Sequence, residues 1–419
     1  MMEIGKRLRS ACILITAGAL IWQAIPQAAA DPGDPGPCAV ASQTAYVNGD
    51  LETYIHYPDG DQCGAEITAS YPAIAFAHGF SMFGLTNGAA DNAGNGEHLA
   101  SWGYVVAIPV LPDDVEGRIT DMQDVLSYLE EQTGTPGSFL YQKVDVERLA
   151  VAGHSFGGAT VLALSARDAR VKAIVALDPV YHQGGPGDNP EIWDPDAKGP
   201  DITAPTCILG APASNCNSEA DYAEIYPSVG ATHKASFLIV GASHCDFMDP
   251  GNWACSLVCE GSTSAERTEL AQKYMSAWFN TYLHLNTSDY DYLYGAEGDG
   301  DIAAGLIERQ VDTAPRDLTA RSLVEAVALE WELYQHPIVA GYNIYRRLAG
   351  EPFSETPNAQ VGKSSTYIDR DVTSGQVYSY TLRSYDPAGN LHQPCDEVSA
   401  VPRAPTSWRY LPIVLRTQD

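Results

Sequence analysis

A serine at a glycine-flanked turn is the residue of this chain best suited to nucleophilic chemistry. Ser155 lies in the hexapeptide Gly-His-Ser-Phe-Gly-Gly at 153–158, between the apolar run Leu149–Ala152 and the helix-forming stretch Ala159–Asp168. Glycines on both sides allow a sharp strand-to-helix turn that exposes the hydroxyl beside a helix N-terminus. A serine hydroxyl is a weak nucleophile, so the chemistry also requires a histidine as general base and a carboxylate to orient it. Without such partners, Ser155 would be an ordinary capping serine.

His244 is the histidine that we expect to act as the base. Enzymes with this type of turn carry their residues in the order Ser, Asp or Glu, then His, each at the carboxyl end of a strand. The run Ser236–Val240 has the composition of a buried strand, and His244 stands in the loop that leaves it. The other candidates stand in a Gly/Pro-rich loop, before a strand and late in a helix, and are His182, His233 and His284.

Asp178 is the carboxylate that we expect to orient this histidine. It ends the apolar strand-type run Lys172–Leu177, and the loop after the next strand, residues 211–215, contains no carboxylate. The carboxyl ends of parallel strands meet at one edge of a sheet, where Ser155 would also lie. The alternatives are a turn-capping role for Asp178 and a catalytic role for Asp201, Glu219 or Asp221.

The turn after the strand Pro72–Ala77 is predicted to complete an oxyanion site. Acyl transfer needs two backbone N–H groups aimed at the developing oxyanion, and Gly79 lets the chain turn back toward the nucleophile. We assign the donors to the N–H groups of Phe80 and Phe156. An apolar wall for the acyl group is expected from nearby side chains, any of which could instead belong to the core: Phe80, Met82, Phe83, Phe156 and Tyr181.

The elements that position these residues follow an alternating pattern over residues 31–285. Helix-forming stretches such as Arg118–Gln132 and Ala265–Leu285 separate short apolar runs. The pattern predicts the α/β class, with a mostly parallel sheet flanked by helices on both faces. The strand-type runs are Ala73–Ala77, Tyr104–Val110, Leu149–Ala152, Ala173–Leu177, Cys207–Leu209 and Phe237–Val240.

A second region follows residue 285. Residues 286–314 are rich in Asp, Gly and Tyr and predict an acidic linker; their carboxylates fit no EF-hand spacing, so a solvated linker is favoured over calcium binding. Residues 315–402 contain short strands with turn signals at about ten-residue intervals, which indicates a small all-β, immunoglobulin-like sandwich. This segment resembles a fibronectin type III domain, with Tyr378 as its tyrosine corner. The tail 403–419 holds an apolar stretch that could be an edge strand or an export or attachment signal.

The N-terminal 30 residues have the three parts of a secretory signal peptide. Three basic residues precede the apolar run Ala11–Ile25, and three alanines follow it before Asp31. A run of about 15 residues is too short to span a bilayer comfortably, which disfavours a membrane anchor. We therefore expect a secreted mature chain that begins near Asp31 and has no integral membrane segment.

Charge and cysteine content restrict the possible binding partners and the cellular compartment. The net charge of −29 excludes binding to nucleic acid or an anionic membrane by long-range attraction. Eight cysteines remain outside the signal, and an oxidising compartment favours disulfides. We predict the pairs Cys38 with Cys63 and Cys207 with Cys216. A zinc site at Cys245, Cys255 and Cys259 is the alternative, but their spacing matches no paired-cysteine motif, so no metal is predicted.

From about residue 45 to 285 these motifs resemble the α/β-hydrolases, in the branch that holds chlorophyllases, platelet-activating-factor acetylhydrolases and bacterial cutinase-like polyester hydrolases. The turn at 153–160 and the 23-residue step from Ser155 to Asp178 resemble the acetylhydrolases and chlorophyllases. Residues 143–145 and 241–244 resemble the polyester hydrolases. The polyester hydrolases carry their acid after the strand that follows the Asp178 strand, where this chain has no carboxylate. They also often carry an aromatic residue before the serine, where this chain has His154.

The resemblance implies a serine ester hydrolase that works without metal or organic cofactor. Its substrate would be an ester, either insoluble and polymeric or a lipid, and we expect a monomer. A phospholipid acetylhydrolase, a chlorophyllase-like esterase, a lipase and a peptidase are alternatives within the hydrolases. An adhesion or binding protein on an inactive hydrolase fold is the alternative from another class. In the hydrolase interpretation, the C-terminal sandwich would serve as a spacer or as a docking module on an insoluble or cell-surface substrate.

Overall fold

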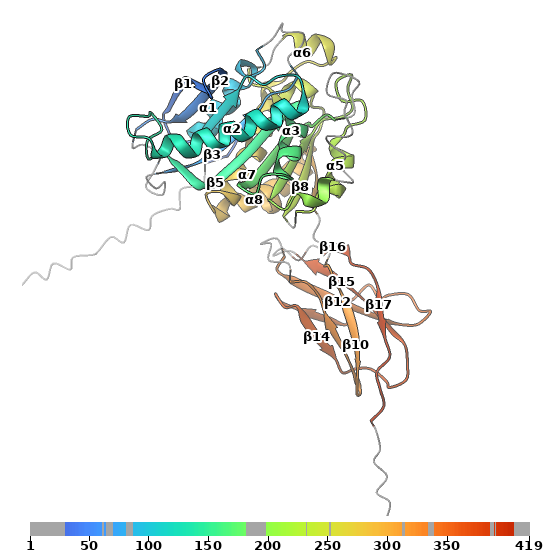
Figure 1. Ribbon diagram of the computed structural model, residues 1–419. Helices are drawn as coiled ribbons and strands as arrows, with labels where there is room; N and C mark the ends of the chain where they lie inside the picture. The colour runs from blue at the N-terminus through green and yellow to red at the C-terminus, as the bar shows by residue number, and fades with distance from the viewer. Residues whose placement is uncertain are drawn as a thin grey trace, which may run out of the picture. The chain divides into compact units, whose positions relative to one another are not determined.

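Figure 1 shows the computed structural model of the chain, which describes residues 30–60, 63, 70–80, 87–181, 198–231, 233–250, 253–311, 315–333, 339–385, 389 and 391–405. The described residues form a mixed sheet with helices in the first part of the chain and antiparallel sheets after residue 318. Residues 1–29 of the expected signal peptide, Met82, Phe83, His182 and residues 406–419 of the tail lie outside the described residues.

The first part is built on a sheet whose nine strands, within the described residues, follow the order β1-β2-β4-β3-β5-β6-β7-β8-β9. The pairs from β4 through β8 run parallel, whereas β1, β2 and β9 pair antiparallel at the two edges. The alternation of short apolar runs and helices thus indicated the parallel core. The strands are β1 (Val40–Val47), β2 (Leu51–Pro58), β3 (Tyr71–Ala77), β4 (Val105–Pro109), β5 (Val144–His154), β6 (Val171–Leu177), β7 (Thr206–Gly210), β8 (Lys234–Ile239) and β9 (Ile307–Val311).

Helices cover both faces of this sheet because neighbouring side chains of a strand point to opposite faces. Ile74 and Phe76 of β3 belong to the core shared with α1 (Ala93–Ser101) and α7 (Ala265–Tyr282). The alternate β3 residues belong to the core shared with the helices of the other face, which are α2 (Val115–Gly134), α3 (Phe156–Ser165) and α5 (Tyr222–Ser228). Among the helices described, none is long and apolar enough to cross a membrane.

The segment expected to be a linker is instead folded between residues 286 and 311. It forms η5 (Thr287–Asp289), α8 (Tyr290–Tyr294), α9 (Ala296–Ala303) and β9, which pairs with β8 as an edge strand of the sheet. Tyr292, Leu293 and Tyr294 are buried. The acidic side chains pair with groups of the fold: Asp301 accepts from Lys273 at 2.9 Å, and Asp289 accepts from the Asn280 amide at 2.6 Å. The linker prediction therefore failed for these residues.

The second part consists of antiparallel sheets, as the short strands predicted. One sheet holds β10 (Thr319–Leu323), β11 (Ala326–Glu330) and β14 (Thr366–Asp369). The other holds β13 (Ala359–Val361), β12 (Gly341–Leu348), β15 (Tyr378–Tyr385) and β16 (Leu391–Pro394), with β17 (Val398–Ala400) paired to β15. Trp331, which follows β11, and Tyr342 of β12 have buried rings that pack edge to face, with their centroids 5.4 Å apart. Residues from the two sheets therefore share a core. The Tyr378 hydroxyl accepts a hydrogen bond from the Thr373 N–H at 3.0 Å, a local contact typical of a tyrosine corner.

Candidate active site

Ser155 occupies the tight turn between β5 and α3. Its φ of 59° and ψ of −125° place it in a backbone region that costs free energy for any residue other than glycine. The surrounding chain holds it there: the Ser155 N–H donates to the Leu177 carbonyl at 2.9 Å, and its own carbonyl accepts from the Val180 N–H at 3.1 Å. A side chain at Gly157 would overlap the Ala77 carbonyl. The glycine is thus required because α3 packs directly against the end of β3.

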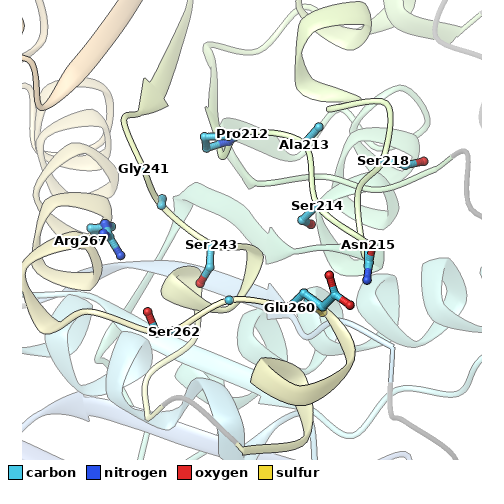
Figure 2. A pocket seen from close by; sticks show the side chains of 13 residues that line it. Pro212, Ala213, Ser214, Asn215, Ser218, Gly241, Ser243, Glu260, Ser262 and Arg267 are labelled. Carbon is cyan, nitrogen blue, oxygen red and sulfur yellow. The ribbon is translucent and has the colours of Figure 1, made fainter.

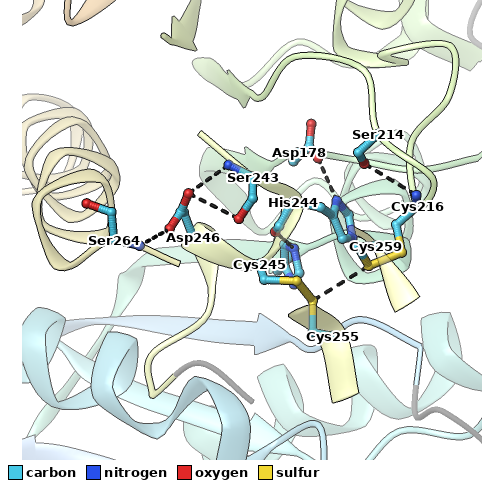
Figure 3. Close-up of a disulfide and its surroundings, with 11 residues drawn as sticks. Asp178, Ser214, Cys216, Ser243, His244, Cys245, Asp246, Cys255, Cys259 and Ser264 are labelled. Atoms are coloured by element: carbon cyan, nitrogen blue, oxygen red, sulfur yellow. Dashed lines mark hydrogen bonds and ion pairs between the residues drawn. A yellow bond between two sulfur atoms is a disulfide. The ribbon is translucent and has the colours of Figure 1, made fainter. Parts of the chain in front are cut away.

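Asp178 and His244 form a buried hydrogen-bonded pair at the carboxyl ends of β6 and β8. The His244 Nδ1–H donates to one Asp178 carboxylate oxygen at 2.6 Å (Figure 3). The side chains are 1% and 4% exposed, so the contact is shielded from water. With Nδ1 donating to a carboxylate, the neutral ring presents Nε2 as an acceptor. Because β5, β6 and β8 run parallel, this pair and Ser155 stand at the same edge of the sheet.

The second Asp178 oxygen is held by the loop that follows β7. It accepts from the Ala211 N–H and from the Asn217 side-chain amide, both at 3.1 Å. Asn217 is itself buried and its amide oxygen accepts the Asp221 N–H at 3.0 Å. Sequence analysis singled out this loop only because it lacks a carboxylate. Its role as the hydrogen-bond partner of Asp178 was missed, since a buried carboxylate needs donors and the sequence does not show which residues supply them.

The alternative acids have other surroundings. Asp221 accepts a hydrogen bond from the Tyr181 N–H at 2.7 Å and so holds the chain beside the expected acyl wall. Glu219 and Asp201 are exposed, the latter in η3 (Gly199–Asp201). Among the alternative bases, the His233 ring nitrogen lies 3.3 Å from the Tyr282 hydroxyl, and the His284 ring packs on Tyr104 at 4.6 Å.

The turn expected to supply one oxyanion donor is held by a buried neutral histidine. The His78 Nδ1–H donates to the Gly79 carbonyl at 2.6 Å, and the ring Nε2 accepts the Leu111 N–H at 2.9 Å. Burial and the nearby Arg118 guanidinium lower the pKa of His78 to about 3. The ring is therefore neutral at ordinary pH and has both nitrogens occupied by the backbone.

Arg118 of α2 links this turn to the helix that carries Phe156. Its guanidinium is fully buried and donates to the carbonyls of His78 and Pro112 and to the Thr160 hydroxyl. It also lies 4.6 Å from the centre of the Phe156 ring. Burial lowers the pKa of Arg118 to about 9, so it remains charged at neutral pH. Sequence reasoning missed this residue, because an arginine in an amphipathic helix ordinarily faces water.

The described residues of the expected acyl wall all pack on the same hydrophobic core. Phe156 is buried in the core cluster on the α2–α3 face of the sheet, and Phe80 and Tyr181 are partly buried against the same cluster. This packing is compatible with a wall role and with a core role for each residue. The structure also holds an open cavity of about 490 Å³ beside the loop that leads to His244, lined by Ser214, Asn215, Ser243, Glu260 and Arg267 among others (Figure 2). The lining of that cavity includes none of the expected wall residues.

His154, which precedes the serine, contacts the expected base directly. Its Nε2–H donates to the His244 carbonyl at 2.9 Å, and the two ring centroids are 4.6 Å apart. Burial and the neighbouring His244 ring lower the pKa of His154 well below its ordinary value. A neutral His154 thus fixes the backbone of His244 without adding a positive charge beside it.

Disulfides surround the acid–base pair. Cys245, next to His244, bonds to Cys255, and Cys216, next to Asn217, bonds to Cys259 (Figure 3). The Sγ atoms of Cys255 and Cys259 are 3.7 Å apart. These cysteines lie close enough together for a metal site, but their sulfurs are already bonded in pairs, so the zinc alternative does not fit.

Of the two predicted disulfides, one is confirmed and one is wrong. Cys38 bonds to Cys63 as predicted. Cys207 remains a free thiol, fully buried on β7 with its pKa raised by burial, while its expected partner Cys216 reaches Cys259. A strand residue pointing into the core cannot meet a cysteine in the loop above the sheet edge.

A family model described as PET hydrolase-like matches residues 25–300, about two thirds of the chain. The chain belongs to this family. Family membership implies the α/β-hydrolase fold, with which the mixed sheet and its flanking helices agree.

Curated relatives carry names of the same kind. The cutinase est2 of Thermobifida alba is 31% identical over 42% of this chain and 53% of its own length. Cutinase 1 of Thermobifida cellulosilytica is 25% identical over 59% of this chain and 80% of its own length. The bis(hydroxyethyl) terephthalate hydrolase of Streptomyces coelicolor is 26% identical over 45% of this chain and 54% of its own length. The chain thus spans about half the length of the first and third of these relatives.

Proposed function

We propose that the protein is a secreted serine carboxylic-ester hydrolase with Ser155 as nucleophile, His244 as general base and Asp178 as the orienting acid. The observation that carries this is the buried 2.6 Å hydrogen bond from His244 Nδ1 to Asp178, at the sheet edge where Ser155 occupies its strained turn. A carboxylate on Nδ1 fixes the tautomer in which Nε2 can accept the serine proton.

The reaction would proceed in two halves. Ser155 Oγ bonds to the ester carbonyl carbon while His244 Nε2 takes the hydroxyl proton, and Asp178 stabilises the imidazolium. The N–H groups of Phe80 and Phe156 would hold the oxyanion, and collapse of the tetrahedral intermediate expels the alcohol, which takes the proton from His244. Water then attacks the acyl-enzyme with His244 again as base, which releases the carboxylic acid and restores Ser155.

Arg118 and His78 act here as positioning residues. The three hydrogen bonds of Arg118 tie the His78 carbonyl to Thr160 of α3, so the turn that carries Phe80 and the helix that carries Phe156 share one support. Oxyanion donors contribute most when they need no rearrangement during the reaction.

We infer that the substrate is a polyester or a related ester. This rests on the PET hydrolase-like family and on relatives named cutinases and a terephthalate-ester hydrolase. Secretion is supported by the expected signal peptide and by three disulfides among the described residues, which form and persist in oxidising compartments. The fibronectin-like identity of residues 315–402 and the expected monomer remain proposals.

One observation favours a second candidate. The acid follows β6, one strand earlier than in the polyester hydrolases that the sequence resembles, and this is the position that resembles phospholipid acetylhydrolases and chlorophyllases. A phospholipid acetylhydrolase would share the triad but prefer short acyl groups on a lipid.

The deciding experiment is hydrolysis of a p-nitrophenyl ester series from acetate to long acyl chains, together with a polyester film and a phospholipid. The parent protein would be compared with Ser155→Ala, Asp178→Asn and His244→Ala. Loss of activity in all three variants would support the triad, and the preferred substrate would choose between the two candidates. A parent protein inactive on every ester would contradict the proposal and favour a binding protein.

A further inference from the structure

The short helix α6 (Trp253–Val258) turns its largest apolar side chains to water. Trp253 is 75% exposed, Leu257 70% and Val258 52%, whereas Ala254 and Cys255 face inward. Trp253 and Leu257 are four residues apart and so lie on the same side of the helix. Single exposed apolar residues are common on proteins, but a tryptophan and two aliphatic residues grouped on one short helix form a patch.

This patch is fastened to the proposed catalytic loops. Cys255 of α6 bonds to Cys245, which follows His244, and Cys259, just after α6, bonds to Cys216, which precedes Asn217 (Figure 3). The Cα atoms of Cys245 and Cys255 are 5.9 Å apart, so ordinary spacing along the chain places the Cα atoms of Trp253 and His244 within roughly 17 Å of each other. The backbone of the patch therefore lies close to the loop that carries His244.

We propose that Trp253, Leu257 and Val258 form a docking surface for an uncharged, water-insoluble ester polymer. The inference rests on the proposed function and names the physical state of its substrate. A dissolved ester diffuses into a site, whereas a solid substrate can be cleaved only if the enzyme stays on its surface. Covering these three side chains would remove exposed apolar area from water, which favours adsorption.

Charge disfavours an anionic lipid surface as the occupant. The chain carries a net charge of −29, which opposes approach to an anionic bilayer, and residues 253–258 contain no charged side chain. A neutral polymer surface meets no such repulsion and presents apolar segments to the patch. The close link to His244 would also bring a polymer chain bound at the patch near the catalytic groups.

The test measures adsorption without catalysis. All proteins carry Ser155→Ala, so that film erosion cannot alter binding. The first has no other change, the second adds Trp253→Ser and Leu257→Ser, and the third adds Leu285→Ser and Val324→Ser. This matched control removes two exposed apolar side chains elsewhere, of which Leu285 is 75% and Val324 51% exposed. Binding isotherms are recorded on amorphous poly(ethylene terephthalate) film, on neutral phosphatidylcholine vesicles and on anionic phosphatidylglycerol vesicles.

The proposal predicts that the Trp253/Leu257 variant partitions onto the film at least about tenfold more weakly, as expected for losing two apolar side chains from the contact. The Leu285/Val324 control should bind within about twofold of its parent. The anionic vesicles should not retain the protein, because both carry negative charge, and the neutral vesicles should bind it more weakly than the film does. Melting temperatures and disulfide content measured by mass spectrometry establish that the variants are folded.

Three results would overturn the proposal. Unchanged film binding by the Trp253/Leu257 variant would remove the patch from adsorption. Vesicle binding as tight as film binding would assign the patch to a lipid. Self-association of the parent that is lost in the variant, with film binding unchanged, would assign it to a second copy of the chain. Hydrolysis of a dissolved ester by the protein with Ser155 intact tests the proposed function separately, so failure of one can be told from failure of the other.

Discussion

The two sides of the proposed site are held in place by different means. On the acid–base side, Asp178 and His244 sit on loops fixed by side-chain hydrogen bonds and by two disulfides. On the nucleophile side, Ser155 and the turn after β3 are fixed by close glycine packing and by two buried side chains, His78 and Arg118. Long loops need cross-links to keep a geometry, whereas a turn packed on the sheet is held by the core itself.

The largest effect is expected at the acid. Asp178→Asn should lower kcat by about 10⁴-fold, because the amide oxygen would keep the two donors of the β7 loop and the NH₂ group would then face Nδ1, which disfavours the required tautomer and removes the negative charge. The measurement is kcat on a soluble p-nitrophenyl ester. Glu219→Gln, an exposed neighbour, serves as the control and should change kcat less than about twofold. An Asp178→Asn protein that keeps a tenth or more of the parent's kcat would show that another residue is the orienting acid.

On the nucleophile side, Arg118→Met should lower kcat by about 10²-fold with KM nearly unchanged, since the oxyanion donors act mainly in the transition state. Arg118→Lys should restore activity only in part, because a single ammonium cannot make all the contacts of the guanidinium. Arg167→Met, which removes an exposed partner of Glu116, is the control. If the Met variant has a lower melting temperature but keeps its kcat, Arg118 stabilises the fold and does not position the oxyanion donors.

The Cys245–Cys255 disulfide is expected to affect both stability and catalysis, whereas the Cys38–Cys63 disulfide is expected to affect stability alone. Removing the Cys245–Cys255 bond with two alanines should cost about 2–3 kcal/mol of unfolding free energy and lower kcat several-fold, since the loop of His244 gains freedom. Removing the Cys38–Cys63 bond should cost a similar free energy and leave kcat unchanged. Denaturant unfolding and ester kinetics on both double variants check this; equal kcat in the two would mean that Cys245 does not position His244.

The buried histidine makes the framework of the nucleophile side sensitive to acid. The pKa of His78 is lowered to about 3 in the folded chain from 6.5, so the unfolded chain binds a proton that the folded chain excludes. Stability is therefore fully present above pH 6.5 and lost as the pH falls toward 3, by about 2 kcal/mol at pH 5. Urea unfolding between pH 8 and pH 4 of the parent protein and of His78→Gln measures it, since the difference excludes other buried histidines with lowered pKa values, such as His56 and His284. An equal fall in stability below pH 6.5 in the parent and in the variant would contradict a neutral buried His78 ring.

Local patterns predicted most of the framework. The turn around Ser155, the parallel order of the central strands and the place of Asp178 and His244 at strand ends each follow from a run of residues and its neighbours. The tertiary partners did not follow in this way. Asn217 and Arg118 act through buried hydrogen bonds between segments far apart in the chain, and a sequence without its fold does not show which polar residues become buried.

The two failed predictions have the same origin. Acidic composition suggested that residues 286–311 were solvated, yet the buried residues Tyr292, Leu293 and Tyr294 anchor this segment and β9 pairs with β8. Cys207 and Cys216 are near each other in sequence, but one points into the core and the other lies in a loop that meets Cys259. In both cases distant contacts outweighed local composition.

We propose that Ser155 is a nucleophile activated by His244. The most direct measurement is labelling with a fluorophosphonate followed by intact-mass and peptide analysis. This role of Ser155 predicts one adduct per chain, on the peptide that contains Ser155, which is lost in Ser155→Ala and strongly reduced in His244→Ala. No adduct on the folded parent protein, or an adduct on a different serine, would contradict it.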